Sequence, residues 1–91
     1  MMARKAMTDT MRFAKIAQTL NDKLSKKGFN FDINPCGWGF IITFPDTGAD
    51  LLINEWSCGI ESYGFPEDNG WPAEDLTIRE AIKKVERLFA A

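Results

Sequence analysis

The alternation of large apolar residues in the middle of the chain constrains the fold most. Phe29, Phe31 and Ile33 alternate with polar side chains, which is typical of a strand with one buried face. The same period returns after a turn at residues 34–37. The apolar face of this second segment comprises Trp38, Phe40, Ile42 and Phe44. Two such strands predict an antiparallel hairpin, and its aromatic face needs other elements to bury it.

The first part of the chain has the period of an amphipathic helix. In residues 9–27 one apolar stripe comprises Phe13, Ile16, Ala17, Leu20 and Leu24. Gly28 follows two lysines and is a typical helix stop, because glycine adopts the left-handed conformation without strain. We therefore expect a helix over these residues with one face against the sheet.

The end of the chain predicts a second amphipathic helix. Thr77 and Glu80 have the spacing of a capping box, in which each side chain accepts a hydrogen bond from the other residue's backbone N–H. Glu80 and Lys84 are also spaced to form an ion pair across one turn. The apolar stripe of this helix comprises Ile78, Ala81, Ile82, Val85, Leu88 and Phe89.

Between the hairpin and the second helix the pattern is weaker. Residues 50–56 contain Leu51, Leu52 and Ile53 in sequence and predict a third strand without assigning its buried face. Residues 59–65 are compatible with a short fourth strand. Residues 66–73 are rich in turn formers and charge, so we expect an exposed loop there.

Together these elements predict an α+β fold. The expected architecture is a two-layer sandwich in the order helix, three or four antiparallel strands, helix, with both helices on one face of the sheet. We expect residues 1–8 to form a flexible N-terminal arm and residues 9–91 a single domain. The order resembles that of the double-stranded-RNA-binding domain. The start of the second helix has Glu74-Asp75-Leu76-Thr77 where that family has a basic signature, so the resemblance implies a fold and no function.

The residue composition excludes most enzyme chemistry. The chain has no histidine, which removes the commonest general base and the usual partner of a Ser or Cys nucleophile. Cys36 and Cys58 lie in an acidic segment that disfavours a thiolate, so we expect structural thiols. The acids around Gly70 lack the spacing of an EF-hand loop. We therefore expect a protein that is no enzyme, with no catalytic residue, no metal site and no cofactor.

The chain also lacks the sequence signals of membrane insertion and secretion. No apolar run approaches the length of a bilayer span, and residues 1–8 lack the apolar segment of a signal peptide. We therefore expect a cytoplasmic protein.

Charge is strongly segregated along the chain. Residues 1–28 contain seven Lys or Arg and two Asp, whereas residues 29–76 contain nine Asp or Glu and no Lys or Arg. Residues 77–91 contain four basic and two acidic side chains. Such blocks can serve only as solvated faces that aid solubility. The absence of every cation from 48 consecutive residues is nevertheless the most distinctive feature of the sequence.

We interpret the acidic segment as a surface that binds a protein rich in Lys and Arg. The predicted contact residues are Glu55, Glu61, Glu67, Asp68, Trp71, Glu74 and Asp75. Because many basic surfaces bind nucleic acid, a concrete form of this hypothesis is an inhibitor that occupies such a surface on a nuclease or defence complex. The chain is similar to phage-encoded anti-CRISPR and anti-restriction proteins in size, acidity and lack of catalytic residues.

Two alternatives remain open at this stage. The first is a nucleic-acid-binding module that acts through one flank of the first helix, with Arg12, Lys15, Lys23 and Lys26 on the phosphate backbone. The second is an accessory or regulatory subunit whose interface is apolar. We expect no direct binding of nucleic acid or membrane, because the nine carboxylates of the middle segment repel phosphate groups.

Overall fold

The computed structural model describes residues 9–90, which form a sheet with a helix at each end of the chain. The elements are α1 (Asp9–Lys26), β1 (Asp32–Cys36), β2 (Gly39–Phe44), β3 (Ala49–Asn54), β4 (Ile60–Tyr63), the 3-10 turn η1 (Pro66–Asp68), β5 (Ala73–Leu76) and α2 (Ile78–Ala90). The five strands are antiparallel and lie in chain order. The α+β class and the element order are confirmed, whereas the expected three or four strands are wrong. The expected N-terminal arm, residues 1–8, lies outside the described residues.

The first hairpin forms, but its first strand lies later in the chain than expected. β1 covers residues 32–36 rather than 29–33, and Pro35 pairs with Phe40. Proline is tolerated here because β1 is an edge strand. The expectation that Trp38 is buried is wrong, since 56% of its surface is exposed. Cys36 pairs with Gly39, so the hairpin turn consists of residues 37 and 38 instead of the expected 34–37, and Trp38 lies in this turn.

The segment after β4 is more regular than the expected loop. Residues 66–68 form η1, and residues 73–76 form β5, the second edge strand of the sheet. The pairing of β4 with β5 is irregular, and Asp75 next to this irregularity has a φ of 54°. β5 has no apolar alternation, so it forms a strand through its pairing with β4 rather than through its own residues.

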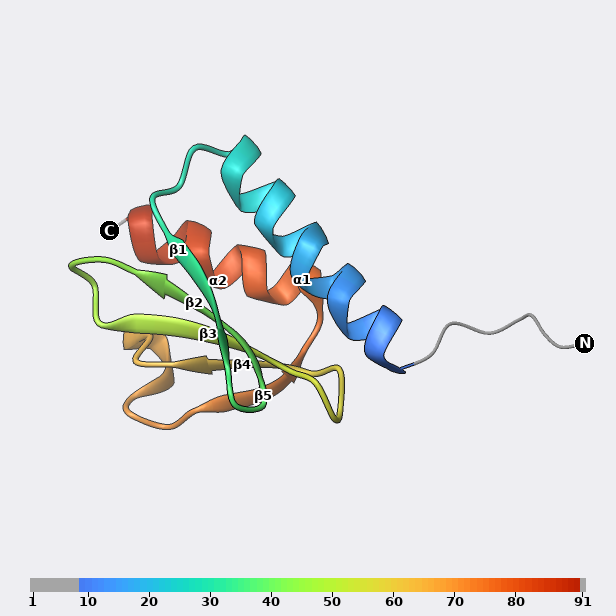
Figure 1. Cartoon of the computed structure of the whole chain (residues 1–91). Helices are drawn as coiled ribbons and strands as arrows, with labels where there is room; N and C mark the ends of the chain where they lie inside the picture. Colours follow the sequence, from blue (N-terminus) through green and yellow to red (C-terminus); the bar gives the residue numbers. More distant parts are fainter. Residues whose placement is uncertain (1–8, 91) are drawn as a thin grey trace, which may run out of the picture.

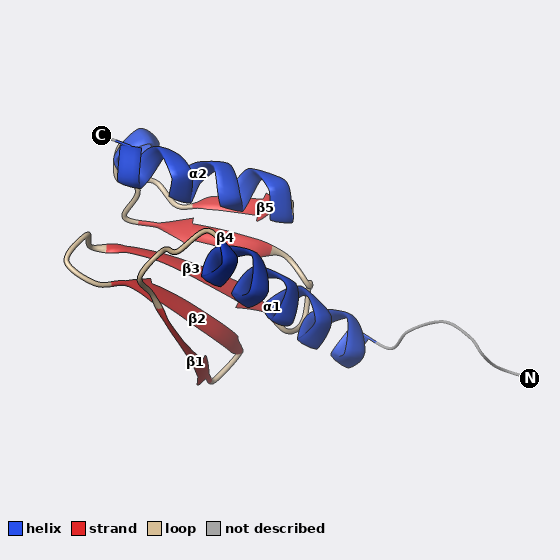
Figure 2. Ribbon diagram, turned by 90° about the horizontal axis from the view of Figure 1, so that it is seen from above, coloured by secondary structure: helices blue, strands red, loops and turns tan. Residues whose placement is uncertain are grey.

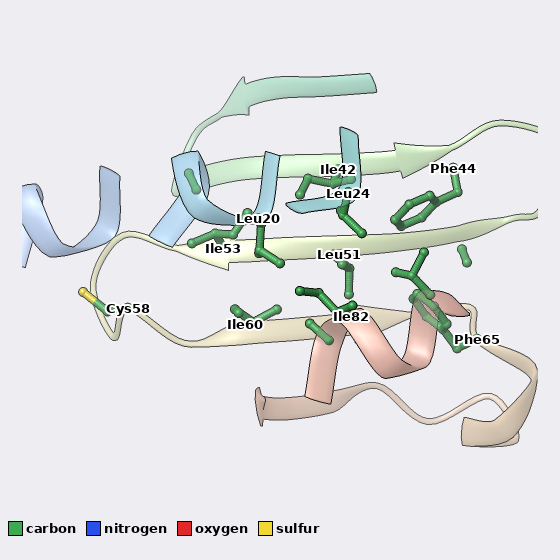
Figure 3. Close-up of a cluster of buried hydrophobic side chains, with 14 of the residues drawn as sticks. Leu20, Leu24, Ile42, Phe44, Leu51, Ile53, Cys58, Ile60, Phe65 and Ile82 are labelled. Atoms are coloured by element: carbon green, nitrogen blue, oxygen red, sulfur yellow. The ribbon is translucent and has the colours of Figure 1, made fainter. Parts of the chain in front are cut away.

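Both helices lie on the same side of the sheet, as Figures 1 and 2 show. Their apolar stripes and the strands share one core (Figure 3). This core comprises Phe13, Ala17, Leu20 and Leu24 from α1, Ile42, Phe44, Ala49, Leu51, Ile53 and Ile60 from the strands, Cys58 and Phe65 from the connections, and Ala81, Ile82 and Val85 from α2. Most of the two predicted stripes is therefore confirmed, with Ile16, Ile78 and Leu88 partly buried against this core. Phe89 is the exception, since 42% of its surface is exposed.

Local sequence signals determine where α1 ends and where α2 begins. The N–H of Phe29 donates to the carbonyl of Leu24 at 3.2 Å, and Gly28 has a φ of 82°, which together form a Schellman stop. At the start of α2 the capping box is confirmed. The N–H of Thr77 donates to Oε1 of Glu80 at 2.9 Å, and the N–H of Glu80 donates to Oγ1 of Thr77 at 3.0 Å. The bond from the backbone of Thr77 holds the pKa of the Glu80 carboxyl below its usual range.

Candidate protein-binding surface

The sheet face opposite the helices is open and acidic. Side chains alternate along a strand, so the residues between the core positions point to this face. We define the acidic face by Asp32, Ile41, Asp50, Leu52, Glu61 and Tyr63. Its apolar centre, Ile41 and Leu52, is half-buried, and carboxylates surround it. Because residues 29–76 contain no Lys or Arg, the strands add no cation to this face.

The strand register arranges these side chains in two rows. Across β1 to β4 the rows are Asp32-Thr43-Asp50-Tyr63 and Asn34-Ile41-Leu52-Glu61. Strands lie about 4.8 Å apart, so Asp32 and Asp50 are about 10 Å from each other, and Ile41 is directly beside Leu52. Within residues 9–90 neither Asp32 nor Asp50 forms an ion pair. Their charges are therefore open to a partner.

The Glu61 carboxylate holds Tyr63 at one side of the acidic face. The Tyr63 hydroxyl donates to Oε1 of Glu61, and Nδ2 of Asn54 donates to Oε2 of the same carboxylate at 3.3 Å. The hydrogen bond to Glu61, together with burial and the negative charges of Glu61 and Glu74, raises the pKa of Tyr63 to about 12. The same hydrogen bond holds the Tyr63 side chain beside Glu61.

The charge blocks of the sequence become two layers of opposite charge. Every Lys and Arg in residues 9–90 lies in α1, in α2 or at Lys27, directly after α1; we call these parts the helix layer. The helix layer also contains the acidic residues Asp9, Asp22, Glu80 and Glu86, so it is mixed in sign but basic in sum. Figure 1 shows both helices on one side of the sheet, and the strand register places the acidic face on the other side. The core therefore separates a basic surface from an acidic one.

Glu67 and Asp68, two of the predicted contact residues, face α2 instead of the acidic face. Nζ of Lys84 lies 2.5 Å from Oδ1 of Asp68 and 3.7 Å from Oε2 of Glu67. The buried hydroxyl of Ser62 donates to Oδ2 of Asp68 at 3.0 Å. Nε and Nη2 of Arg87 donate to the two carboxylate oxygens of Glu67 at 3.3 and 2.8 Å. These contacts fasten η1 to α2 and leave both carboxylates with cations of their own.

The expected ion pair between Glu80 and Lys84 is wrong. Lys84 is buried on the side of α2 that faces η1, and its cation pairs with Glu67 and Asp68. The Glu80 carboxylate is exposed and accepts the capping hydrogen bond from Thr77. Spacing along the helix permits the pair, but a buried ammonium is stabilised more by a carboxylate in the same buried site.

The other predicted contact residues are spread over the molecule. Glu61 lies on the acidic face, and Glu74, in β5, lies near enough to Tyr63 to affect its pKa. Glu55 lies in the turn between β3 and β4, and Trp71 lies in the loop between η1 and β5, with 78% of its surface exposed.

Asp75 also belongs to β5, but it lies beside Gly59. The seven predicted residues therefore do not form one continuous surface.

Two exposed tryptophans meet at the end of the sheet that holds the β1–β2 and β3–β4 turns. The rings of Trp38 and Trp56 are 6.4 Å apart in an edge-to-face arrangement. The N–H of Glu55 donates to the carbonyl of Trp38 at 2.8 Å, which joins the two turns. Aromatic side chains of this kind are enriched in protein interfaces, so this pair is a further candidate contact at this end of the sheet.

Sequence reasoning missed the carboxylates that define the acidic face, Asp32 and Asp50. Both residues occupy polar positions in the strand pattern of the sequence. Asp32 alternates with Phe31 and Ile33, and Asp50 precedes Leu51. The correct strand register places both residues opposite the core. The three apolar residues at 51–53 do not show which face of β3 is buried, so the sequence alone does not give this register.

Other kinds of site find little support in the described residues. Among residues 9–90 no group of three or more His, Cys, Asp or Glu side chains is arranged to hold a metal ion. No disulfide joins Cys36, half-buried, to Cys58, buried. Neither described helix combines the length and apolarity needed to cross a bilayer. Comparisons with protein-family models, curated proteins and solved structures yield no significant match.

Proposed function

We propose that this protein is a non-enzymatic binding protein whose acidic face covers a Lys- and Arg-rich surface of another protein. The observation that carries the proposal is the composition of the open sheet face: Asp32, Asp50 and Glu61 surround Ile41 and Leu52, and no cation lies among them. A solvated face that serves only solubility has no need of a half-buried apolar centre. An interface uses that centre for contact area and the surrounding charges for selection of its partner.

Electrostatics favours a basic partner over other partners. The carboxylates of the acidic face have no counter-ion within the described residues, so a Lys or Arg from a partner adds attraction without breaking an existing pair. A phosphate backbone is repelled by the same charges. Long-range attraction between an acidic and a basic surface raises the association rate, and salt reduces this effect.

In its specific form the proposal is that the covered surface is one that binds nucleic acid. Such surfaces are exposed, basic and broad, and a flat sheet face with rows of carboxylates competes with phosphates for the same cations. The protein would then act as an inhibitor of a nuclease or defence complex, of the phage anti-CRISPR or anti-restriction type.

A competition experiment tests this form. The immobilised protein captures its partner from a lysate of the source organism, and the partner, once identified and purified, is titrated with labelled DNA and RNA. We expect the protein to displace the nucleic acid at stoichiometric amounts, and the variant Asp32→Lys/Asp50→Lys to fail. A partner that binds nucleic acid equally well in the presence of the protein contradicts the proposal, as does a partner without a basic surface.

A further inference from the structure

A groove between the two helices is a second candidate binding surface, separate from the acidic face. It has a volume of about 560 Å³, and its walls are formed by Lys23 and Lys27 on one side and by Arg79 and Lys83 on the other. Ile78, half-buried, and Ile82, buried, form its apolar part. The groove therefore combines an apolar floor with four cations at its rim.

The cations of this groove follow the pitch of the helices. Lys23 and Lys27 are four residues apart, and so are Arg79 and Lys83, so each wall presents two positive charges one helical turn apart, about 6 Å. Like charges at this spacing disfavour a helix. Nothing in the packing of the core requires them, because all four side chains are exposed.

Three of the four cations are not neutralised within the described residues. Lys27 lies 3.1 Å from Oε2 of Glu86, which also lines the groove. Lys23, Arg79 and Lys83 form no ion pair with any other residue from 9 to 90. An anionic ligand would therefore meet three unpaired cations next to the partly buried apolar floor of the groove.

We infer that this groove binds an acidic amphipathic helix of another protein. Carboxylates spaced by one turn on such a helix match the cations of both walls, and an apolar side chain between them covers Ile78 and Ile82. A nucleic-acid backbone supplies the charge but no apolar side chain for the floor. The chain's own first eight residues contain Arg4 and Lys5 and no carboxylate, so they lack the required charge.

This inference is independent of the proposed function, because the groove and the acidic face belong to opposite layers of the molecule. A basic partner on the acidic face and an acidic helix in the groove can be tested separately, with different variants and different ligands.

The test uses a fluorescein-labelled peptide of about 16 residues with Leu on one helical face and Glu at positions one turn apart. Its binding is followed by fluorescence anisotropy at ~0.15 M salt. We expect wild-type protein to bind it, and Lys23→Glu/Arg79→Glu to weaken binding by at least about tenfold. The control Lys15→Glu/Lys26→Glu, with the same charge change on α1 outside the groove, is expected to weaken it by less than about threefold.

A second peptide and a further variant test whether the ligand binds through both its apolar side chains and its charges. A peptide with Ser in place of Leu is expected to bind at least about tenfold more weakly, because it leaves the apolar floor uncovered. Lys83→Gln, which introduces no negative charge, is expected to weaken binding in the same direction and serves if the double variant does not fold.

Four results overturn the inference: no binding of the Leu peptide by wild-type protein, equal losses in the groove and control variants, equal binding of the Ser peptide, or tighter binding of a DNA duplex that the groove variant abolishes. The last of these would assign the helix layer to nucleic acid instead.

Discussion

The buried ion pair between η1 and α2 allows a quantitative prediction about stability. Lys84 Nζ lies 2.5 Å from Oδ1 of Asp68, and the two side chains are only 8% and 13% exposed. Lys84→Met retains a long apolar stem, and it also removes the ammonium that lies 5.5 Å from the centre of the Phe65 ring. The variant removes the ammonium and leaves the Asp68 carboxylate in a site that water barely reaches.

The expected loss is about 3 kcal/mol of unfolding free energy. Removal of one partner of a buried ion pair costs roughly 3–5 kcal/mol, because the remaining charge is uncompensated. The lower end applies here, since Ser62 still donates a hydrogen bond to the carboxylate at 3.0 Å. A small domain loses about 4–8 °C of Tm per kcal/mol, so the melting temperature is expected to fall by roughly 12–24 °C.

Urea denaturation followed by circular dichroism measures this loss. Arg87→Met is the control, because its exposed pair with Glu67 is expected to contribute less than about 1 kcal/mol. In a double-mutant cycle with Asp68→Asn, the two losses are expected to be non-additive by about 2 kcal/mol. A loss below about 1 kcal/mol for Lys84→Met, or additive losses, would refute the argument that the pair is buried and coupled.

Three further outcomes are expected. Thr77→Ala removes the side-chain cap of α2 and is expected to lower stability by about 1 kcal/mol in thermal melts; an unchanged melting temperature would contradict the capping geometry. Tyr63 is expected to titrate, by absorbance of the tyrosinate, at about 12 rather than 10, and Glu61→Gln to lower this pKa. The folded state holds the phenolic proton more tightly than the unfolded state, so Tyr63 contributes to the free energy of unfolding. This contribution is fully present below pH 10 and is lost as the pH rises through 12. A titration at the ordinary value would contradict the Glu61 contact. Gly64→Ala is expected to cost at least about 2 kcal/mol more than Gly70→Ala, because both have positive φ but only at Gly64 would a Cβ meet a backbone carbonyl oxygen, at 2.2 Å; equal losses in urea titrations would show that φ alone matters.

Features that depend on a few neighbouring residues could be predicted from the sequence. Gly28 ends α1, and the capping box at Thr77 begins α2, because both signals act within one turn of helix. The core stripes of the helices were predictable for the same reason. Trp38 was mispredicted because Asn34 and Pro35 indicate a turn, whereas both residues pair within β1 and the turn comes at residues 37 and 38.

Features that depend on contacts between distant segments could not be predicted. β5 has no strand pattern, and Lys84 meets Asp68 across 16 positions of the sequence. The acidic segment itself was evident from composition. Which of its carboxylates gather on one face follows from strand register, and register turns Asp50 toward the open face while η1 turns Asp68 toward α2.

The association rate of the protein with its captured basic partner, measured at low and at physiological salt, tests the acidic face most directly. Asp32→Lys/Asp50→Lys is compared with Asp22→Lys/Glu86→Lys, which makes the same change in net charge on the helix layer. We predict that the acidic-face variant associates at least about tenfold more slowly, that the control changes far less, and that salt reduces the difference. Equal association rates for the two variants would contradict the assignment of the acidic face as the binding surface.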